Sequence, residues 1–457
     1  MSDYWTLHIK NFAKIREANI EAAPLVLFVG DNSSNKSYLL SLLWGLTQAF
    51  SPSLPDGIPK SNRSGELQAM LHPRLSRNSS RDLLINEEMH QVCIDEFNAL
   101  LTSISDQLIR WIFNCEKIPV ESIHLTVPYK QDRFIRLSEV TVTNPSDQNE
   151  QSQKQYVLRR KYKDASRSYW RFRTLDTRFL LLYTALCLNP HIENVFLPAP
   201  RTGYLLTYKT LAQEIFSSRF GEVKHSSSER LTSPHISFLR NLIDLKQKSE
   251  PDRYASIIRF IEENLIGGNI GITETPTADV FYRQNGLEHS LPLYRSSGVV
   301  SEVAGLLCMM KYGNFPPVCI FEEPETCLHP ALQRQMARAL IKMVNAGITV
   351  WASTHSVDII QHVNNMIKLH HHQDGKQLRE EHGYHEDDVI SPDKVRMYQF
   401  DVKPDNKTDV TSLECDVNGF PVPTFGNAIR KSRDDVIAFH VDGQDSSQES
   451  IWEKGEE

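Results

Sequence analysis

The 457-residue chain is predicted to adopt an α/β fold with buried parallel strands and a long insertion, on three observations. The apolar run 25–29 leads through a polar loop into a helical pattern that begins at Lys36. Two further apolar runs, 318–321 and 348–352, alternate with helical patterns between residues 299 and 364. Short apolar strands that alternate with helices are typical of parallel sheets covered on both faces.

The other elements follow from apolar periodicity and from Ser-, Pro- and Gly-rich breaks. In chain order we expect a hairpin (7–12 and 18–21), a helix (36–50), a linker (52–80), a helix (83–115), strands with a polar loop (120–162), a helix (175–188), a strand (195–197), helices (205–265), a hairpin (270–292), and then helix (from 299), strand (318–321), helix (330–345), strand (348–352) and helix (357–364). No internal repeat is found.

The family resemblance that the motifs below carry implies that this pattern divides into a split head and an insertion. Residues 1–50 form the first lobe and residues 280–440 form the second lobe. Residues 51–279 form a mostly helical insertion, or arm, with some strands that complete the head. Residues 441–457 are an acidic tail that we expect to be disordered.

Composition fits an ordinary globular protein, with 40% hydrophobic and 23% charged residues. The net charge of −7 excludes a general polycation, so contact with DNA would need a local basic patch or a partner. The seven cysteines are odd in number and form no CxxC pair, which favours the reducing cytoplasm. We expect neither a signal peptide nor contact with a membrane, because no apolar run is long enough.

The strongest motif is the polar loop after the run 25–29, which matches the phosphate loop G-x-x-x-x-G-K-[ST] at all defined positions but one. Its residues are Gly30, Asp31, Asn32, Ser33, Ser34, Asn35, Lys36 and Ser37. Such a loop cradles ATP phosphates with backbone N–H groups, while Lys36 reaches the β and γ phosphates and Ser37 binds Mg²⁺. Asn35 replaces the second Gly. Asn is the residue next most tolerant of left-handed backbone, so the loop can still form and bind ATP. Its Cβ and amide would lie close to the phosphates, so we expect slow or absent hydrolysis.

Two later segments supply candidate catalytic groups. Glu322 and Glu323 end the run 318–321, which resembles a Walker B strand in which Glu322 supports Mg²⁺ and Glu323 orients the attacking water. Taken alone, the same pattern also fits a strand that runs into an acidic turn. His355 follows the run 348–352, where a sensor of the γ-phosphate is expected. A single His is more often structural, and only the strand context favours the sensor.

A fourth motif opens the helical pattern at residue 299. Ser296, Ser297 and Gly298 combine two hydroxyls and a glycine at a helix N-terminus, where anions bind. By itself this arrangement is only a helix cap. Together with the other motifs it is interpreted as a signature sequence that reaches the nucleotide of another subunit.

The order of the four motifs resembles the ABC-type ATPase heads of the RecF, SMC and overcoming-lysogenization-defect (OLD) group. The N-terminal segment WTLHIKNFAKIREANIEAAPLVLFVGDNSSNKS, the segment EEPETCLHP and the segment ASTHS carry the resemblance. It implies an ABC-type P-loop head with a helical arm, ATP and Mg²⁺ as cofactors, and head-to-head homo-oligomers. Motif coverage is about a third of the chain.

Within that group, the absence of long coiled coils and the stretch LPAPRTGYLLTY resemble the stand-alone ATPases of bacterial antiphage operons. The PtuA family of Septu systems is the first choice and the AriA family of PARIS systems is the second. This resemblance implies an ATP-binding regulator or sensor of a separate nuclease subunit, of the HNH or TOPRIM type. Two alternatives remain open: a RecF-like DNA-repair ATPase that acts directly on phage or host DNA, and a non-hydrolysing scaffold.

Four other features suggest weaker sites. The segment 441–445 faintly resembles an acidic nuclease motif, but an intrinsic TOPRIM nuclease is not expected because no core follows it. His370, His371 and His372, with His382 and His385, are interpreted as a solvated polar loop rather than a metal site. The basic stretch 159–163 fits a solvated strand edge better than a nucleic-acid contact. Arg201 could contact nucleotide or pin a loop, and the sequence favours neither.

Overall fold

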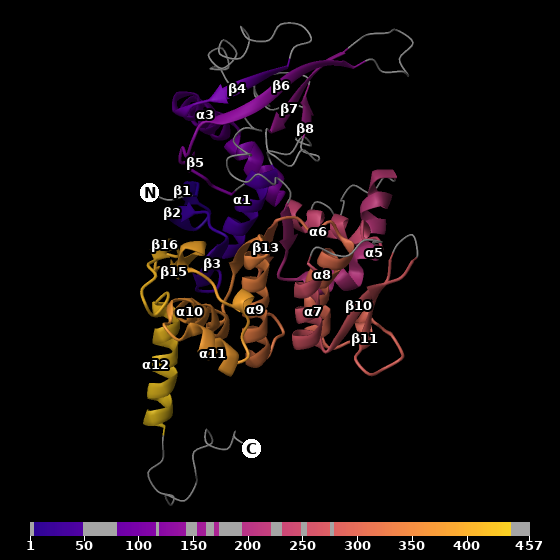
Figure 1. Ribbon diagram of the computed structural model, residues 1–457, viewed down its shortest axis with the longest axis vertical. Helices are drawn as coiled ribbons and strands as arrows, with labels where there is room; N and C mark the ends of the chain where they lie inside the picture. The colour runs from indigo at the N-terminus through magenta and orange to yellow at the C-terminus, as the bar shows by residue number, and fades with distance from the viewer. Residues whose placement is uncertain are drawn as a thin grey trace, which may run out of the picture.

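The computed structural model describes residues 4–48, 80–115, 118–142, 153–160, 169–172, 194–220, 231–247, 254–274 and 278–439. Within them, the main sheet has nine strands in the order β5-β1-β2-β16-β15-β3-β14-β13-β9 (Figure 1). These strands are β1 (Thr6–Phe12), β2 (Ile15–Glu21), β3 (Leu25–Gly30), β5 (Ser122–Thr126), β9 (Asn194–Leu197), β13 (Val318–Glu322), β14 (Thr349–Ser353), β15 (Val395–Val402) and β16 (Thr408–Leu413).

Two smaller sheets lie outside the main one. The first has the order β4-β6-β7-β8, and its strands are β4 (Ser80–Ile85), β6 (Arg133–Val142), β7 (Gln153–Arg160) and β8 (Tyr169–Phe172). The second has the order β10-β11-β12, with β10 (Gly268–Ile272), β11 (Val280–Gln284) and β12 (Leu291–Pro292). Figure 1 shows the four-stranded sheet at one end of the molecule, beyond α3 (Glu87–Phe113), and strands β10 and β11 at the right, beside α7 and α8.

The remaining helices are α1 (Lys36–Gln48), α5 (Arg201–Phe220), α6 (Ser233–Ile243), α7 (Ala255–Ile261), the π-helical turn η3 (Glu262–Ile266), the 3-10 turn η4 (Leu293–Arg295), α8 (Gly298–Tyr312), α9 (Pro330–Asn345), α10 (Val357–His371), α11 (Gly375–Glu381), the 3-10 turns η5 (Glu386–Asp388) and η6 (Pro392–Lys394), and α12 (Pro423–Ala438). No helix among the described residues is long and apolar enough to cross a membrane.

The centre of the main sheet is parallel and is buried on both faces. Strands β9, β13, β14, β3 and β15 run parallel, whereas β1, β2 and β5 pair antiparallel at one edge. Alternate side chains of β3 enter different cores: Val26 and Phe28 pack on the α1 and α3 side, and Leu25 and Leu27 on the side of α8, α9 and α10. This two-sided burial explains why β3 reads as a continuous apolar run, and it confirms the α/β prediction.

Most predicted elements in the described residues are present, and the differences lie mainly after residue 364. The predicted helix 357–364 continues to His371, so His370 and His371 lie on α10 and the prediction of a loop there is wrong. The helix continues because Val363, Met366 and Ile367 are buried at helical spacing. Strands β8, β15 and β16 and helices α11 and α12 were not predicted, and β4 lies where the linker and the start of the helix 83–115 were predicted. The predicted linker, the helix 175–188 and the acidic tail lie outside the described residues.

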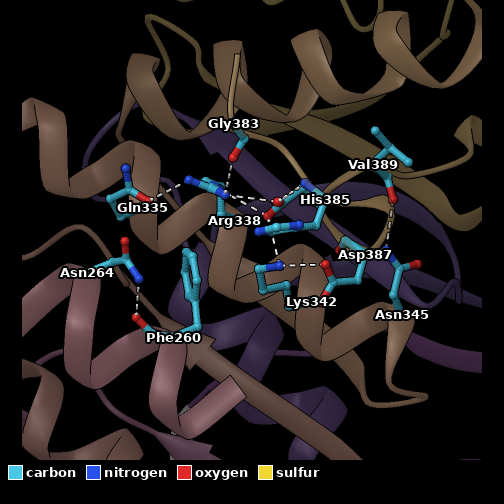
Figure 2. A network of polar contacts seen from close by, with 11 residues as sticks. Phe260, Asn264, Gln335, Arg338, Lys342, Asn345, Gly383, His385, Asp387 and Val389 are labelled. Carbon is cyan, nitrogen blue, oxygen red and sulfur yellow. Dashed lines mark hydrogen bonds and ion pairs between the residues drawn. The ribbon is translucent and has the colours of Figure 1, made fainter. Parts of the chain in front are cut away.

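A buried ionic network fixes α9 against the segment that leads to β15 (Figure 2). Asp388 has a fully buried side chain and accepts hydrogen bonds from Arg338 through both carboxylate oxygens, at 3.0 and 2.9 Å. Lys342 Nζ lies 3.1 Å from Asp388 and 2.7 Å from Asp387. The guanidinium of Arg338 and the ammonium of Lys342 both face the ring of Phe260 on α7. One end of α9 is thereby tied to two separate segments of the chain.

Candidate nucleotide site

Three neighbouring strands bring the predicted site residues to one edge of the sheet. Strands β3, β14 and β13 are adjacent and parallel, so their carboxyl ends lie side by side. The loop 31–35 follows β3, His355 follows β14, and Glu322 ends β13. The carboxyl edge of a parallel sheet is where ligands of open α/β folds bind.

The loop 30–37 contains three residues with positive φ. Gly30 has φ of 123°, and a Cβ there would lie 2.2 Å from the carbonyl oxygen of Phe400, so only glycine fits. Asn35 has φ of 71°, which is left-handed, and Ser33 has φ of 57°. The replacement of Gly by Asn at position 35 therefore preserves the backbone conformation. Its side chain brings a buried Oδ1 atom that has no hydrogen-bond partner among the described residues.

Lys36 folds back over this loop. Its ammonium donates hydrogen bonds to the carbonyl oxygens of Gly30 at 3.2 Å and Asp31 at 2.6 Å, and to Ser34 Oγ at 3.1 Å. Lys36 is the first residue of α1, where helical N–H groups have no partner inside the helix. Ammonium and N–H donors therefore converge on the loop, and such convergence is suited to binding phosphate.

Burial of Lys36 lowers the pKa of its ammonium to about 8, although Glu323, Asp31 and Glu325 oppose the shift. Only the protonated form attracts phosphate. We expect ATP affinity to fall about twofold between pH 7 and pH 8 and then more steeply, approaching about tenfold for each pH unit. The measurement is ATP affinity between pH 7 and 9.5. In the Lys36→Arg variant the side chain stays charged, and its profile should be flat. A flat wild-type profile would contradict the role of Lys36.

The acidic end of β13 faces the helix that carries Lys36. Glu322 is buried and accepts a hydrogen bond from the backbone N–H of Ala199 at 2.9 Å and another from the hydroxyl of Ser37. Burial raises the pKa of its carboxyl, and these hydrogen bonds oppose the shift. A hydroxyl and a carboxylate held together are the oxygen ligands that Mg²⁺ prefers. The two side chains therefore fit the Mg²⁺ that the phosphate-loop pattern implies.

Glu323 and His355 approach each other beside the loop. His355 Nε2 lies 3.9 Å from Glu323 Oε1, and the imidazole also hydrogen-bonds to the carbonyl of Gly30. Burial and the charge of Lys36 lower the pKa of His355, so its ring is neutral at pH 7. Glu323 has left-handed backbone, with φ of 44°, which turns its side chain away from the strand direction.

Glu325 is a functional candidate that sequence reasoning missed. Its carboxylate accepts a hydrogen bond from the backbone N–H of His355 and another from the side chain of Thr354. Burial raises the pKa of Glu325, and these contacts oppose the shift. Glu325 thereby joins the acidic turn, which comprises residues 322–327, to the turn that carries His355. The third carboxylate of the segment EEPE was the available signal.

The predicted signature residues lie at the N-terminus of α8. Ser297 caps α8 by accepting a hydrogen bond from the N–H of Val300 at 3.3 Å, and both Ser297 and Gly298 are exposed. The contact nearest to a Cβ built at Gly298 is Cys327 of the acidic turn, at 3.9 Å. Ser296 donates to the carbonyl of Leu293 at 2.6 Å. Within the described residues, no recorded contact joins residues 296–298 to the loop 30–37.

The four weaker candidate sites from the sequence have different outcomes. Arg201 is buried and pins backbone carbonyls, as described below. The described residues contain no group of three or more His, Cys, Asp or Glu side chains arranged to hold a metal ion, including the His residues near 370 and 385. Part of the basic stretch 159–163 and the whole segment 441–445 lie outside the described residues.

No protein-family model matches the chain, and no curated protein matches it. Among solved structures it is similar to an SMC head bound to the C-winged helix domain of ScpA, with 14% identity, a TM-score of 0.39, and coverage of 90% of this chain and 98% of that one. It is also similar to the SMC head domain from Thermotoga maritima, with 11% identity, a TM-score of 0.33, and coverage of 91% and 100%. A third is the SMC head with an extended coiled coil bound to the C-terminal domain of ScpA derived from Pyrococcus furiosus, with 13% identity, a TM-score of 0.37, and coverage of 95% and 100%. All three are SMC heads, and none is more than 14% identical to this chain.

Proposed function

We propose that this protein binds ATP with Mg²⁺ at the carboxyl edge of β3, β14 and β13, as an ABC-type ATPase head. The observation that carries the proposal is the convergence of Lys36, the Ser37–Glu322 pair and the Glu323–His355 pair at this edge. The separate observations support one another because the five side chains come from three different strand ends. A chance phosphate-loop match would not bring a carboxylate pair and a histidine to the same place.

Each residue has a distinct role in this proposal. Lys36 leaves its backbone acceptors and binds the β and γ phosphates, while Ser37 and Glu322 hold Mg²⁺. Bound Mg²⁺ supplies charge neutralisation at the phosphate oxygens. Glu323 orients the attacking water. His355, a neutral imidazole anchored on Gly30, detects the γ-phosphate by hydrogen bonding.

Hydrolysis is proposed to be slow because of Asn35. Its side-chain NH₂ can donate to phosphate in the ground state as well as in the transition state, and such an interaction does not speed the reaction. We expect Asn35→Gly to raise the rate of phosphate release by up to about a hundredfold, with ATP affinity changed much less. Asn32→Gly is the control, because it makes the same substitution at an exposed position of the loop. Fast wild-type turnover that Asn35→Gly leaves unchanged would contradict this assignment.

ATP is proposed to pair two heads, with Ser296, Ser297 and Gly298 of one protomer facing the nucleotide of the other. The support is that Ser297 and Gly298 are exposed at the N-terminus of α8, and that among the described residues they form no hydrogen bond or ion pair with the loop 30–37. We expect Ser297→Arg to abolish the ATP-dependent increase in mass measured by light scattering, without unfolding the chain. Ser297→Ala measures loss of the helix cap alone, and Thr411→Arg adds the same charge at a distant exposed position. Unchanged pairing in Ser297→Arg would rule out the sandwich.

The finer biological role rests on the resemblance of the motifs to antiphage ATPases. We propose a regulatory subunit that senses infection and controls a separate nuclease, with ATP acting as a ligand that shifts the state of the assembly. The test is purification together with the product of the neighbouring gene, followed by a nuclease assay with and without ATP. ATP-dependent control of a co-purified nuclease supports this role. DNA binding by the isolated chain with no nuclease partner would favour the RecF-like alternative instead.

A further inference from the structure

Arg201 is a buried cation that no step of the proposed chemistry uses. It opens α5, close after β9, and its side chain is 1% exposed. Its guanidinium lies over the ring of Phe321, 4.8 Å from the ring centroid. Burying a guanidinium is unfavourable unless its donors are satisfied, and a buried ion pair is by itself weak support for stability. The contacts that satisfy this guanidinium therefore indicate what the residue does.

Those contacts are concentrated on the backbone of the acidic turn. Arg201 donates to the carbonyl of Glu322 at 2.8 Å and to the carbonyl of Glu323 at 3.0 Å. A third donor reaches the carbonyl of Pro198 at 3.2 Å. Two consecutive peptide groups, which carry both candidate catalytic carboxylates, are thus held by one rigid planar group.

The backbone conformation of Glu323 explains why the hydrogen bonds from Arg201 are needed. Its φ of 44° is unfavourable for a residue with a Cβ and persists only where the surroundings impose it. The carbonyl of Glu323 also accepts hydrogen bonds from the N–H of Thr326 at 3.1 Å and from its hydroxyl at 2.9 Å. Arg201 and Thr326 together fix the peptide that directs the Glu323 side chain toward His355.

The same guanidinium is paired with the helix that carries the signature residues. Arg201 lies 2.6 Å from the carboxylate of Glu302, and its Nε donates to the Glu302 carbonyl at 3.3 Å. Thr202 hydrogen-bonds to the other oxygen of the Glu302 carboxylate. Glu302 lies on α8, between one and two turns after Ser297. One buried side chain therefore bridges α8 and the acidic turn.

We infer that Arg201 is a positioning residue that couples the signature end of α8 to the carboxylates of Glu322 and Glu323 within one protomer. This inference rests on the proposed function. When a partner's nucleotide contacts Ser297, a displacement of α8 reaches the acidic turn through the Glu302–Arg201 ion pair. In the opposite direction, nucleotide bound at Glu322 sets the position of α8 for pairing.

The test uses Glu302→Gln, which keeps the size of the side chain and removes its charge. The matched control is Glu262→Gln, because Glu262 pairs with Lys311 of the same helix at 2.6 Å and has no recorded contact with the acidic turn. ATP affinity is measured in the unpaired Ser297→Arg background, and ATP-dependent pairing is measured without that change. We expect Glu302→Gln to bind ATP within about threefold of the parent and to pair at least about tenfold more weakly. Glu262→Gln should change neither property.

Hydrogen exchange in the nucleotide-free protein supplies a second readout. The N–H of Thr326 should exchange faster in Glu302→Gln than in Glu262→Gln, because its acceptor is the peptide that Arg201 holds. If Glu302→Gln does not fold, Thr202→Val removes only the hydroxyl that orients Glu302 and allows the same comparison. If Glu302→Gln matches the Glu262→Gln control in both pairing and exchange, the inference is wrong and the proposed function is unaffected. A wild-type chain that binds no ATP would overturn the proposed function and the inference together.

Discussion

Replacing Lys36 by alanine is expected to abolish ATP binding at micromolar nucleotide. The ammonium of this buried residue is held among three loop acceptors, at the place where the phosphates are proposed to bind. Removal of one partner of a buried charged contact weakens affinity by about 30-fold to several thousandfold. Isothermal titration with ATP and Mg²⁺ measures the change.

The control for this variant is Lys376→Ala, which removes an exposed ammonium on α11. It should bind ATP as the wild type does, because an exposed charge outside the site contributes little. Thermal unfolding of both variants separates loss of binding from loss of fold. Tight ATP binding by a folded Lys36→Ala chain would contradict the assignment of the loop.

Replacing Asp388 by asparagine is expected to lower the free energy of unfolding by about 3–5 kcal/mol. The side chain of Asp388 is fully buried, and its loss of charge leaves Arg338 and Lys342 without their shared partner. Chemical denaturation at pH 7 measures the change. The control is Asp358→Asn in the more exposed ion pair with Arg334, which lies on α9 as Arg338 and Lys342 do, and it should cost less than about 1 kcal/mol.

The destabilisation also has a definite pH dependence. Burial alone would raise the pKa of Asp388, but hydrogen bonds from Arg338 and from the N–H of His385 outweigh burial and lower it. A carboxyl with a lowered pKa stabilises the fold above its unfolded pKa of about 3.9, and this contribution is lost as pH falls through the folded pKa. The difference between wild type and Asp388→Asn should therefore shrink in acid. A difference that grows in acid would be inconsistent with the ion network of Figure 2.

Local patterns were sufficient for the elements that position the site. Residues close together in the sequence were enough to predict the apolar run at β3, the loop with Lys36 and the helix α9 at Pro330–Asn345. A strand buried on both faces gives a continuous apolar run, and a helix gives apolar residues at helical spacing. The left-handed backbone at Asn35 follows from the residue type as well. The α/β class and the candidate residues Glu322, Glu323 and His355 came from the same kind of signal.

Strand β15 was missed although it forms part of the loop's environment. Its residue Phe400 places a carbonyl against Gly30, and the N–H of Val402 donates to the side chain of Asp31 at 3.0 Å. These partners are about 370 residues apart in the chain, so no local pattern records their pairing. The strand order of the sheet, which places β15 beside β3, is a property of the assembled fold.

The chain by itself therefore determined the α/β class, the loop, and the residue types at three strand ends, because each depends on neighbouring residues and their periodicity. Only the tertiary structure decided that Arg201 pins the acidic turn and that Glu325 holds the backbone of His355. The physical reason is that these outcomes depend on strand order and on buried polar groups, which find hydrogen-bond partners wherever folding brings them. Distance along the sequence carries no information about such partners.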